Sequence, residues 1–425
     1  MVVVQDEKSL IQEKKIVRAL DLRMMPLFCV FYFADFLDRA NIGNATLAGI
    51  QNDLHLSSSQ LSFAISAFYI TYIMFEIPSN CILKRTRASI YLSSIMLAWG
   101  LVTIVLAFVT NFVGLFICRL LLGVAQSGYV PAILYQMSLV YKPTENTMRV
   151  AVLLTMASLS GIVSGPLAYA SSFLEGQNGL HGWQYLFILE GVPTVVLSVL
   201  SFFLLFDDIS RVKWLTNDQK EIQRSRMAQS SSDSNDGEHS NSSVTFQTFI
   251  QTFADWKVYM FSLVYFCQAV CMTSISIFLP TIIAGFGYPV LTSQLLTAPP
   301  CIASSAFVLL SGYITDRYDR RTPILIFGFF IMIMGYVLLL ILHDSWALYG
   351  GLFVLTSGMG MVAAPTVGWS SVNFPDATIR VLAVATVVMI GNSGGVVASF
   401  LYPISNAPHH CKELFFFPKR IIHFT

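Results

Sequence analysis

Long apolar stretches separated by short polar segments dominate the chain. A helix that spans a bilayer needs about 20 largely apolar residues, and eleven stretches reach that length. Runs such as residues 90–109 are apolar on every side, whereas the strands of a membrane barrel alternate apolar and polar positions. The pattern predicts an all-α polytopic membrane protein with spans at approximately 24–45, 61–83, 88–110, 112–138, 148–172, 183–206, 257–284, 293–315, 322–342, 346–370 and 377–403.

A polar segment between the sixth and seventh spans divides the chain into two parts. Half of residues 230–243 are serine, which is typical of a linker that is partly disordered. Two short basic loops, at 81–91 and 312–324, each follow the second span of their part, which indicates two homologous halves. We therefore expect four regions: 1–206, a cytoplasmic N-terminus and a six-helix bundle; 207–256, a cytoplasmic linker; 257–403, a bundle of five spans; and 404–425, a divergent polar and aromatic tail.

Composition and charge exclude several classes of protein. Only 12% of the residues are charged, against roughly 25% in ordinary soluble domains. The 25 basic and 24 acidic residues nearly cancel, so no global field favours nucleic acid. The seven cysteines contain no CxxC pair, and no Ser/His/Asp arrangement lies in a plausible aqueous pocket. We expect no cofactor, no metal and no enzymatic activity.

The distribution of Lys and Arg predicts the orientation. With the N-terminus inside, 20 of the 25 basic residues fall in cytoplasmic segments and none falls in the opposite loops. Such an asymmetry places the N-terminus in the cytoplasm.

Ionisable residues inside the spans are few, and most lie in the first half. A charged side chain costs several kcal/mol near the centre of a bilayer, so it marks a transport pathway or a paired structural site. Arg119 in the fourth span can bind an anionic substrate, or it can form a buried ion pair with Asp38 or Glu190. Asp35 and Arg39 stand four residues apart on the first span, in the order that favours an ion pair.

The roles of the remaining polar residues stay open at this stage. Asp38 and Glu190 either take up a proton during transport or remain ionised as partners of an arginine. Glu76, near the cytoplasmic end of the second span, favours a gate or a helix-end contact. In the second half, Gln268 and Asn392 can hydrogen-bond a ligand or bridge packed helices.

Several motifs carry a resemblance to a known family. The loop pattern GxxxDRxxRR is present as Gly312, Asp316, Arg317, Arg320 and Arg321. More specific matches are DFLDRANIGNA (35–45), EIPSN (76–80), RLLLGVAQSGYVPA (119–132), GWQYLFILEG (182–191), FLPTII (278–283), QLLTAPP (294–300) and GNSGG (391–395). From about residue 30 to 408 the chain resembles a major facilitator superfamily transporter, and it is most similar to the fungal allantoate permease family of anion:cation symporters.

The resemblance implies twelve helices in two bundles, with a central site that opens alternately to each side of the membrane. It also implies proton-coupled uptake of a small organic anion such as a vitamin, ureide or carboxylate. The family's arginine of the fourth span falls on Arg119, and its Asp-Arg pair falls on Asp38 and Arg39. Two departures stand out. Gln126 occupies a position where the family usually has Glu, and no run after Pro403 is long enough for a twelfth helix.

These observations predict a secondary active transporter that uses proton symport. We expect substrate binding by Arg119, Arg39, Gln126, Gln268 and Asn392, proton coupling by Asp38 or Glu190, and gating by Glu76 and the loop motif. The expected partners are a small organic anion, protons and the lipid bilayer, with no nucleic acid, and the expected state is a monomer in the plasma membrane. The alternative is a truncated paralogue that does not transport, or a membrane protein that senses its ligand.

Overall fold

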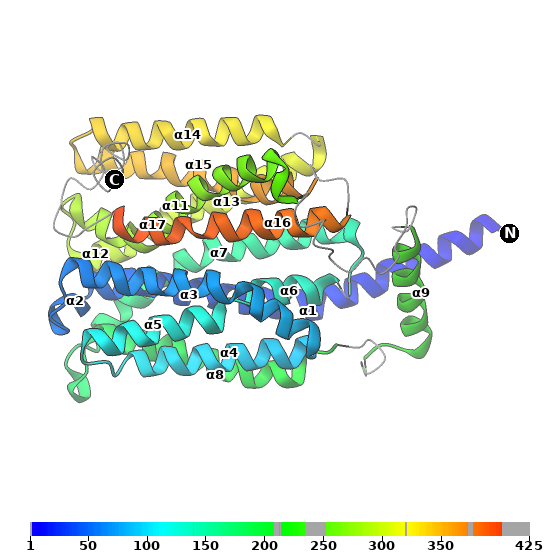
Figure 1. Ribbon diagram of the computed structural model, residues 1–425, viewed down its shortest axis with the longest axis horizontal. Coiled ribbons are helices and arrows are strands. Elements are labelled where there is room, and N and C mark those ends of the chain that lie inside the picture. The colour runs from blue at the N-terminus through cyan, green and yellow to red at the C-terminus, as the bar shows by residue number, and fades with distance from the viewer. Residues whose placement is uncertain are drawn as a thin grey trace.

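The structure is a computed structural model that describes residues 2–138, 140–207, 212, 214–233, 252–318, 321–372 and 377–401. Within these ranges every regular element is a helix and no strand occurs (Figure 1). The predicted all-α class is therefore confirmed. The predicted tail, 404–425, lies outside the described residues.

The first half folds into a bundle of long helices. Ser57 and Asn111 cap two of them by accepting hydrogen bonds from the backbone N–H groups of Gln60 and Gly114. The predicted span 112–138 is interrupted near Gly128, which packs directly against Ser79 and Tyr91. The helices are α1 (Val2–Leu47), α3 (Ser58–Arg85), α4 (Ala88–Leu106), α5 (Phe112–Gln126), α6 (Tyr129–Ser138), α7 (Pro143–Ser172) and α8 (Gly182–Leu204), with the short α2 (Ile50–Asp53) and η1 (Gln177–Gly179) between them.

The second half forms another bundle, shown in green to red in Figure 1. Its helices are α11 (Trp256–Gly285), α12 (Val290–Leu295), α13 (Ala298–Tyr318), α14 (Thr322–Ile341), α15 (Ser345–Val372), α16 (Ala377–Asn392) and α17 (Gly394–Leu401). Within the described ranges, nine helices are long and apolar enough to cross a membrane, and Thr386–Phe400 is a shorter apolar helix. The apolar part of α1 carries Asp35, Asp38 and Arg39.

The two bundles meet most extensively along three pairs of helices. α1 packs against α11, α7 against α13, and α3 against α17. In Figure 1 most of the first bundle, which runs from blue at α1 to green at α8, lies below the second. A buried apolar core extends through both bundles and includes Phe28, Trp99 and Trp183 in the first and Leu352 and Val362 in the second.

Glycines bring the bundles into close contact near one end of the molecule, which we call the Leu47 end because α1 finishes there. A Cβ added to Gly43 would lie 1.8 Å from the backbone oxygen of Ile277. A Cβ on Gly165 would lie 2.0 Å from the backbone oxygen of Gln294, and Gly161 faces the Cys301 sulfur. All of these residues lie in the halves of their helices nearest the Leu47 end. The bundles are thus tightly closed there.

The opposite end, which we call the linker end, carries an extension that the sequence pattern did not predict. α1 begins at Val2, far before the expected start at residue 24, and its 46 residues correspond to about 69 Å of helix, roughly twice the apolar thickness of a bilayer. Ile16, Leu20 and Met24 form a stripe with a spacing of four residues and are fully buried. The extension is therefore a packed part of the fold.

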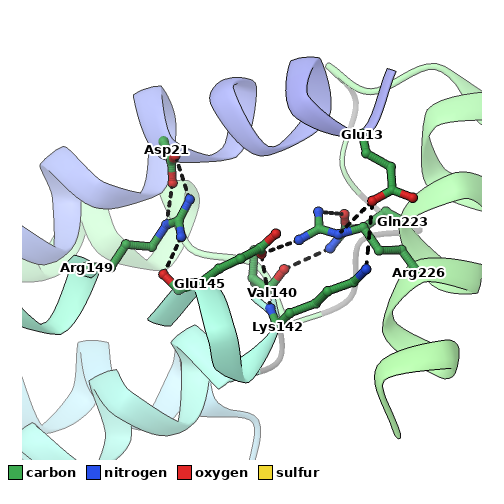
Figure 2. A network of polar contacts seen from close by, with 8 residues as sticks. All are labelled: Glu13, Asp21, Val140, Lys142, Glu145, Arg149, Gln223 and Arg226. Atoms are coloured by element: carbon green, nitrogen blue, oxygen red, sulfur yellow. Dashed lines mark hydrogen bonds and ion pairs between the residues drawn. The ribbon is translucent and has the colours of Figure 1, made fainter. Parts of the chain in front are cut away.

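A network of polar contacts joins this extension to the start of α7 and to the linker helix α9 (Asn217–Asp233), as Figure 2 shows. Arg149 forms a bidentate pair with Asp21, with N–O distances of 2.6 and 2.7 Å. Arg226 on α9 is 1% exposed and pairs with Glu145 and Glu13. The first part of the linker is thus helical and attached to the first bundle, and residues 234–251 lie outside the described ranges.

Candidate functional site

Six charged side chains lie within the apolar parts of the first-bundle helices. Asp35 and Arg39 form the predicted ion pair, with 2.9 Å between Arg39 Nη2 and Asp35 Oδ2. The Arg39 guanidinium also lies over the rings of Tyr72 and Phe36, at 4.9 and 5.0 Å from their centroids. An ion pair and cation–π contacts therefore stabilise the Arg39 charge in an apolar setting.

Asp38 is held by two helices of the same bundle. Its carboxylate accepts hydrogen bonds from the Thr103 hydroxyl on α4, at 3.0 and 3.1 Å, and from the Gln126 amide on α5, at 2.9 Å. Asp38 is 5% exposed. The two donors stabilise the ionised form of this carboxylate, and a glutamate in place of Gln126 would instead set two carboxylates against each other.

Glu190 does not meet Arg119. On α8 the Glu190 carboxylate accepts a hydrogen bond from the Asn41 side chain of α1, and Glu190 Oε1 has no hydrogen-bond partner. The ion pairs found among the described residues do not join Arg119 to Glu190. Of the two ion-pair partners that the sequence allowed for Arg119, the structure thus places Glu190 elsewhere.

Arg119 is the intramembrane cation that has no ion-pair partner among the described residues. It lies about 10 Å along α5 from the start of that helix and is only 3% exposed. Its Nε and Nη2 atoms are buried and have no hydrogen-bond partner. Its strongest charged neighbour is Asp38, which lies outside ion-pair distance, followed by the Tyr69 hydroxyl. Because buried guanidinium N–H groups are costly to leave unpaired, this side chain is suited to an anion that arrives from outside the protein.

Tyr69, Glu76 and Asn392 bring the two bundles together beside this cluster. The Tyr69 side chain on α3 hydrogen-bonds Thr273 on α11 and packs against Gly395. Farther along α3, the Glu76 carboxylate accepts a hydrogen bond from the Asn392 amide on α16. The structure thus places two predicted site residues, Glu76 and Asn392, in contact with each other.

The other predicted residues are placed as follows. Gln268 on α11 is 6% exposed, and its Oε1 has no partner. Gly312 is buried in α13, and Arg321 precedes α14. The side chains of Asp316 and Arg317, and residue Arg320, lie outside the described residues.

Sequence reasoning missed Thr103, Asn41, Tyr69 and Thr273, because uncharged polar residues in a span give no signal without their geometry. In the described ranges no group of three or more His, Cys, Asp or Glu residues could hold a metal ion.

Comparisons with known proteins agree with this architecture. The sequence model described as Major Facilitator Superfamily matches residues 28–401. An uncharacterized transporter of Schizosaccharomyces pombe is 34% identical over 90% of this chain and 76% of its own. The major facilitator-type transporter hxnP of Emericella nidulans is 28% identical over 95% of this chain and 81% of its own.

Solved structures share the fold at low sequence identity. The xylose transporter XylE from E. coli, in a partially occluded inward-open conformation, gives a TM-score of 0.72 at 14% identity and covers 92% of this chain and 93% of its own. A bacterial homologue of the human lysosomal transporter Spinster, in an inward-facing and unoccupied conformation, gives 0.70 at 14% identity and covers 89% of this chain and 81% of its own.

Proposed function

Because this chain belongs to the major facilitator superfamily and is a multi-pass membrane transporter, we propose that it carries a small organic anion across the membrane by proton symport. The substrate would be of the vitamin, ureide or carboxylate type, in keeping with the resemblance to the allantoate permease family. Transport would proceed by rocking of the two bundles around a central site. The proposed setting is the plasma membrane, with a monomeric chain whose N-terminus is cytoplasmic.

One observation carries this proposal: the unpartnered guanidinium of Arg119. A planar guanidinium presents two parallel N–H groups that match a carboxylate. The Asp38 carboxylate beside it is already held by Thr103 and Gln126. Arg119 therefore keeps two buried donors for a substrate anion, and Asp38 supplies a nearby negative charge that keeps the empty site from being strongly cationic.

The packing of the bundles supports alternating access as the mechanism. The close glycine contacts at Gly43, Gly161 and Gly165 lie toward the Leu47 end. With a cytoplasmic N-terminus this end would be extracellular, and the proposed cycle would open it to admit the substrate.

Uptake by cells that express the chain tests the proposal. We would measure entry of labelled nicotinate, allantoate, pantothenate, biotin and short dicarboxylates at pH 5 and pH 7.5, with the surface amount of the protein quantified in parallel. We expect uptake of at least one anion that is faster at pH 5 and abolished by a protonophore. Ligand binding without net flux, at normal surface expression, would support the sensing alternative instead.

Two variants assign the anion site. Arg119→Gln removes the charge and should abolish uptake, because a buried anion that loses its charged partner is destabilised by about 3–5 kcal/mol, a factor of more than a hundred in affinity. Arg119→Lys keeps the charge but loses the bidentate geometry, so a partial loss is expected. Full uptake by Arg119→Gln would show that the anion binds elsewhere.

A further inference from the structure

The carboxylates of the spanning helices differ in which bundle supplies their partner. Asp35 pairs with Arg39 on its own helix. Asp38 is bound by α4 and α5, and Glu190 by α1, all within the first bundle. Movement of one bundle against the other leaves these contacts unchanged. Among the intramembrane carboxylates whose side chains the structure describes, Glu76 alone has its direct partner on the second bundle.

Glu76 sits at the interface between the bundles and away from bulk water. It lies nine residues before the end of α3 at Arg85, which corresponds to about 14 Å of helix, and it is 8% exposed. One carboxylate oxygen accepts from Asn392, whereas Oε2 is buried without a partner. Arg39 on α1 also interacts with Glu76 electrostatically, but it forms its ion pair with Asp35.

The other titratable groups near Glu76 are tyrosines. Tyr72 lies one turn away on α3, and Tyr265 faces it from α11. The ion pairs found among the described residues do not include Glu76. The amide of Asn392 is therefore the direct stabiliser of the ionised carboxylate.

The helix that carries Asn392 is broken at this point. α16 ends at Asn392 and α17 begins at Gly394, and the backbone hydrogen bonds of Ser393 and Val396 are of the turn type. Broken helices near the centre of a membrane are typical places for ion and substrate sites in transporters. Glycines lie on both sides of the break. Gly391 packs on Tyr265 within the second bundle, and Gly395 packs on Tyr69 of the first.

We propose that Glu76 is the residue whose protonation is coupled to the relative movement of the two bundles, a role that rests on the proposed symport. Rocking displaces the Asn392 amide relative to the Glu76 carboxylate, because α16 and α3 belong to different bundles. An ionised carboxylate that loses its donor while it is buried is costly. Separation from Asn392 therefore favours uptake of a proton, and the contact with Asn392 in the present state favours its release.

The chemistry of the cycle follows from this arrangement. A protonated Glu76 is neutral and can donate a hydrogen bond, whereas an ionised Glu76 only accepts. In the present state, in which Glu76 and Asn392 are in contact, the ionised form is held by Asn392 and the proton has been released. In the opposite state, in which Glu76 is separated from Asn392, Glu76 is protonated and neutral. The protein therefore changes state without leaving an unpaired charge buried at this position. Arg119 binds the anion, so proton and substrate occupy different sites.

A distance measurement tests this inference without a known substrate. Spin labels at Phe173, at the end of α7, and at Val290, at the start of α12, report the separation of the bundles at the Leu47 end; both side chains are exposed. The seven native cysteines are replaced by serine. In the parent we expect the distance distribution, measured by pulsed electron spin resonance in nanodiscs, to shift between pH 5 and pH 7.5.

Glu76→Gln, which imitates the protonated residue, should give the same distribution at both pH values. Glu221→Gln is the control, because this carboxylate is exposed on α9, outside the interface between the bundles, and it should keep the response of the parent. A parental response in Glu76→Gln, or no response in the parent, would overturn the inference. If Glu76→Gln does not fold, Asn392→Leu tests the same inference, because it removes the amide that stabilises the ionised Glu76 carboxylate. It should move the midpoint of the response to higher pH, and an unchanged midpoint would contradict the proposal.

Uptake separates this inference from the proposed function. Where the parent accumulates one of the labelled anions, Glu76→Gln should still exchange that anion across the membrane but should lose the difference between pH 5 and pH 7.5. Proton-driven accumulation that persists in Glu76→Gln would refute the role of Glu76 and leave the symporter proposal intact. Absence of uptake in the parent, with a distance response that depends on Glu76, would refute the proposed function and retain the proton site.

Discussion

Gly165 is the position where a single methyl group most clearly tests the idea that two bundles separate at the Leu47 end. A Cβ at Gly165 would lie 2.0 Å from the Gln294 backbone oxygen and 2.1 Å from Thr297 Oγ1. The nearer atom belongs to the backbone of α12 and cannot rotate away. The methyl group of Gly165→Ala is therefore accommodated only if α7 and α12 move apart.

The expected magnitude follows from this overlap. Overpacking of a close contact costs about 1–3 kcal/mol, and this cost falls only on the state that is closed at the Leu47 end. The ratio of open to closed molecules should rise by about 5- to 150-fold, since 1.4 kcal/mol corresponds to a factor of ten. Uptake should slow as well, because the closed state is part of every transport cycle.

Cys301 provides a natural reporter for this shift. Its sulfur faces Gly161 at the same interface between α7 and α13. With Cys301 as the sole cysteine, we expect a membrane-impermeant maleimide to label Gly165→Ala faster than the parent. Gly285→Ala is the matched control, because no atom lies within 4 Å of the added Cβ. A labelling rate equal to that of the control, or a lower melting temperature without faster labelling, would refute the reasoning.

Three further changes should have measurable effects. Gln126→Glu places a second carboxylate against Asp38, and because two adjacent carboxylates share one proton, the variant should lose thermal stability as pH rises from 5 to 8. At the Leu47 end, burial raises the pKa of Glu175, but the hydrogen bond from the Gly182 N–H outweighs it and the pKa lies below its usual value of 4.5. Glu175→Gln should thus melt at a lower temperature than the parent at pH 7, and the difference should shrink as pH falls below 4.5. Arg226→Gln removes a buried cation from the network of Figure 2 and should accelerate tryptic cleavage within α9, since breaking a buried ion pair costs about 3–5 kcal/mol.

Each of these outcomes has a contrary result. A Gln126→Glu variant whose stability does not depend on pH would mean that the two carboxylates do not meet. A constant difference between Glu175→Gln and the parent down to pH 3 would mean that the ionised carboxylate does not contribute. Unchanged proteolysis of Arg226→Gln, with the exposed Glu221→Gln as control, would mean that the remaining contacts of α9 are sufficient to hold it.

The architecture could be predicted from sequence because long apolar runs have few alternatives in a bilayer. Each predicted span corresponds to a helix or to a pair of helices separated by a short break. The breaks themselves were not predicted. A helix interrupted at Gly128 or Ser393 remains apolar on both sides, and hydropathy therefore does not distinguish it from a continuous helix. The extension of α1 was missed for the opposite reason, since its buried stripe of Ile16, Leu20 and Met24 is surrounded by charges.

Local contacts of the candidate site could be predicted from sequence, whereas contacts between distant parts of the chain could not. The ion pair of Asp35 and Arg39 is local, so a spacing of four residues was enough to predict it. The environments of Arg119 and Glu190 depend on residues far away in sequence. Asn41, which binds Glu190, is 149 positions distant, and no periodicity encodes such a contact. For the same reason the contact between Glu76 and Asn392 emerged only from the packing of two bundles.

Net transport by the purified chain is the most direct test of the central claim. In proteoliposomes with an imposed pH gradient, acidic outside, we predict that a labelled organic anion accumulates inside above its external concentration, and that Arg119→Gln abolishes this accumulation. Anion levels that only equalise across the membrane, or accumulation that survives in Arg119→Gln, would contradict a proton symporter that binds its substrate at this arginine.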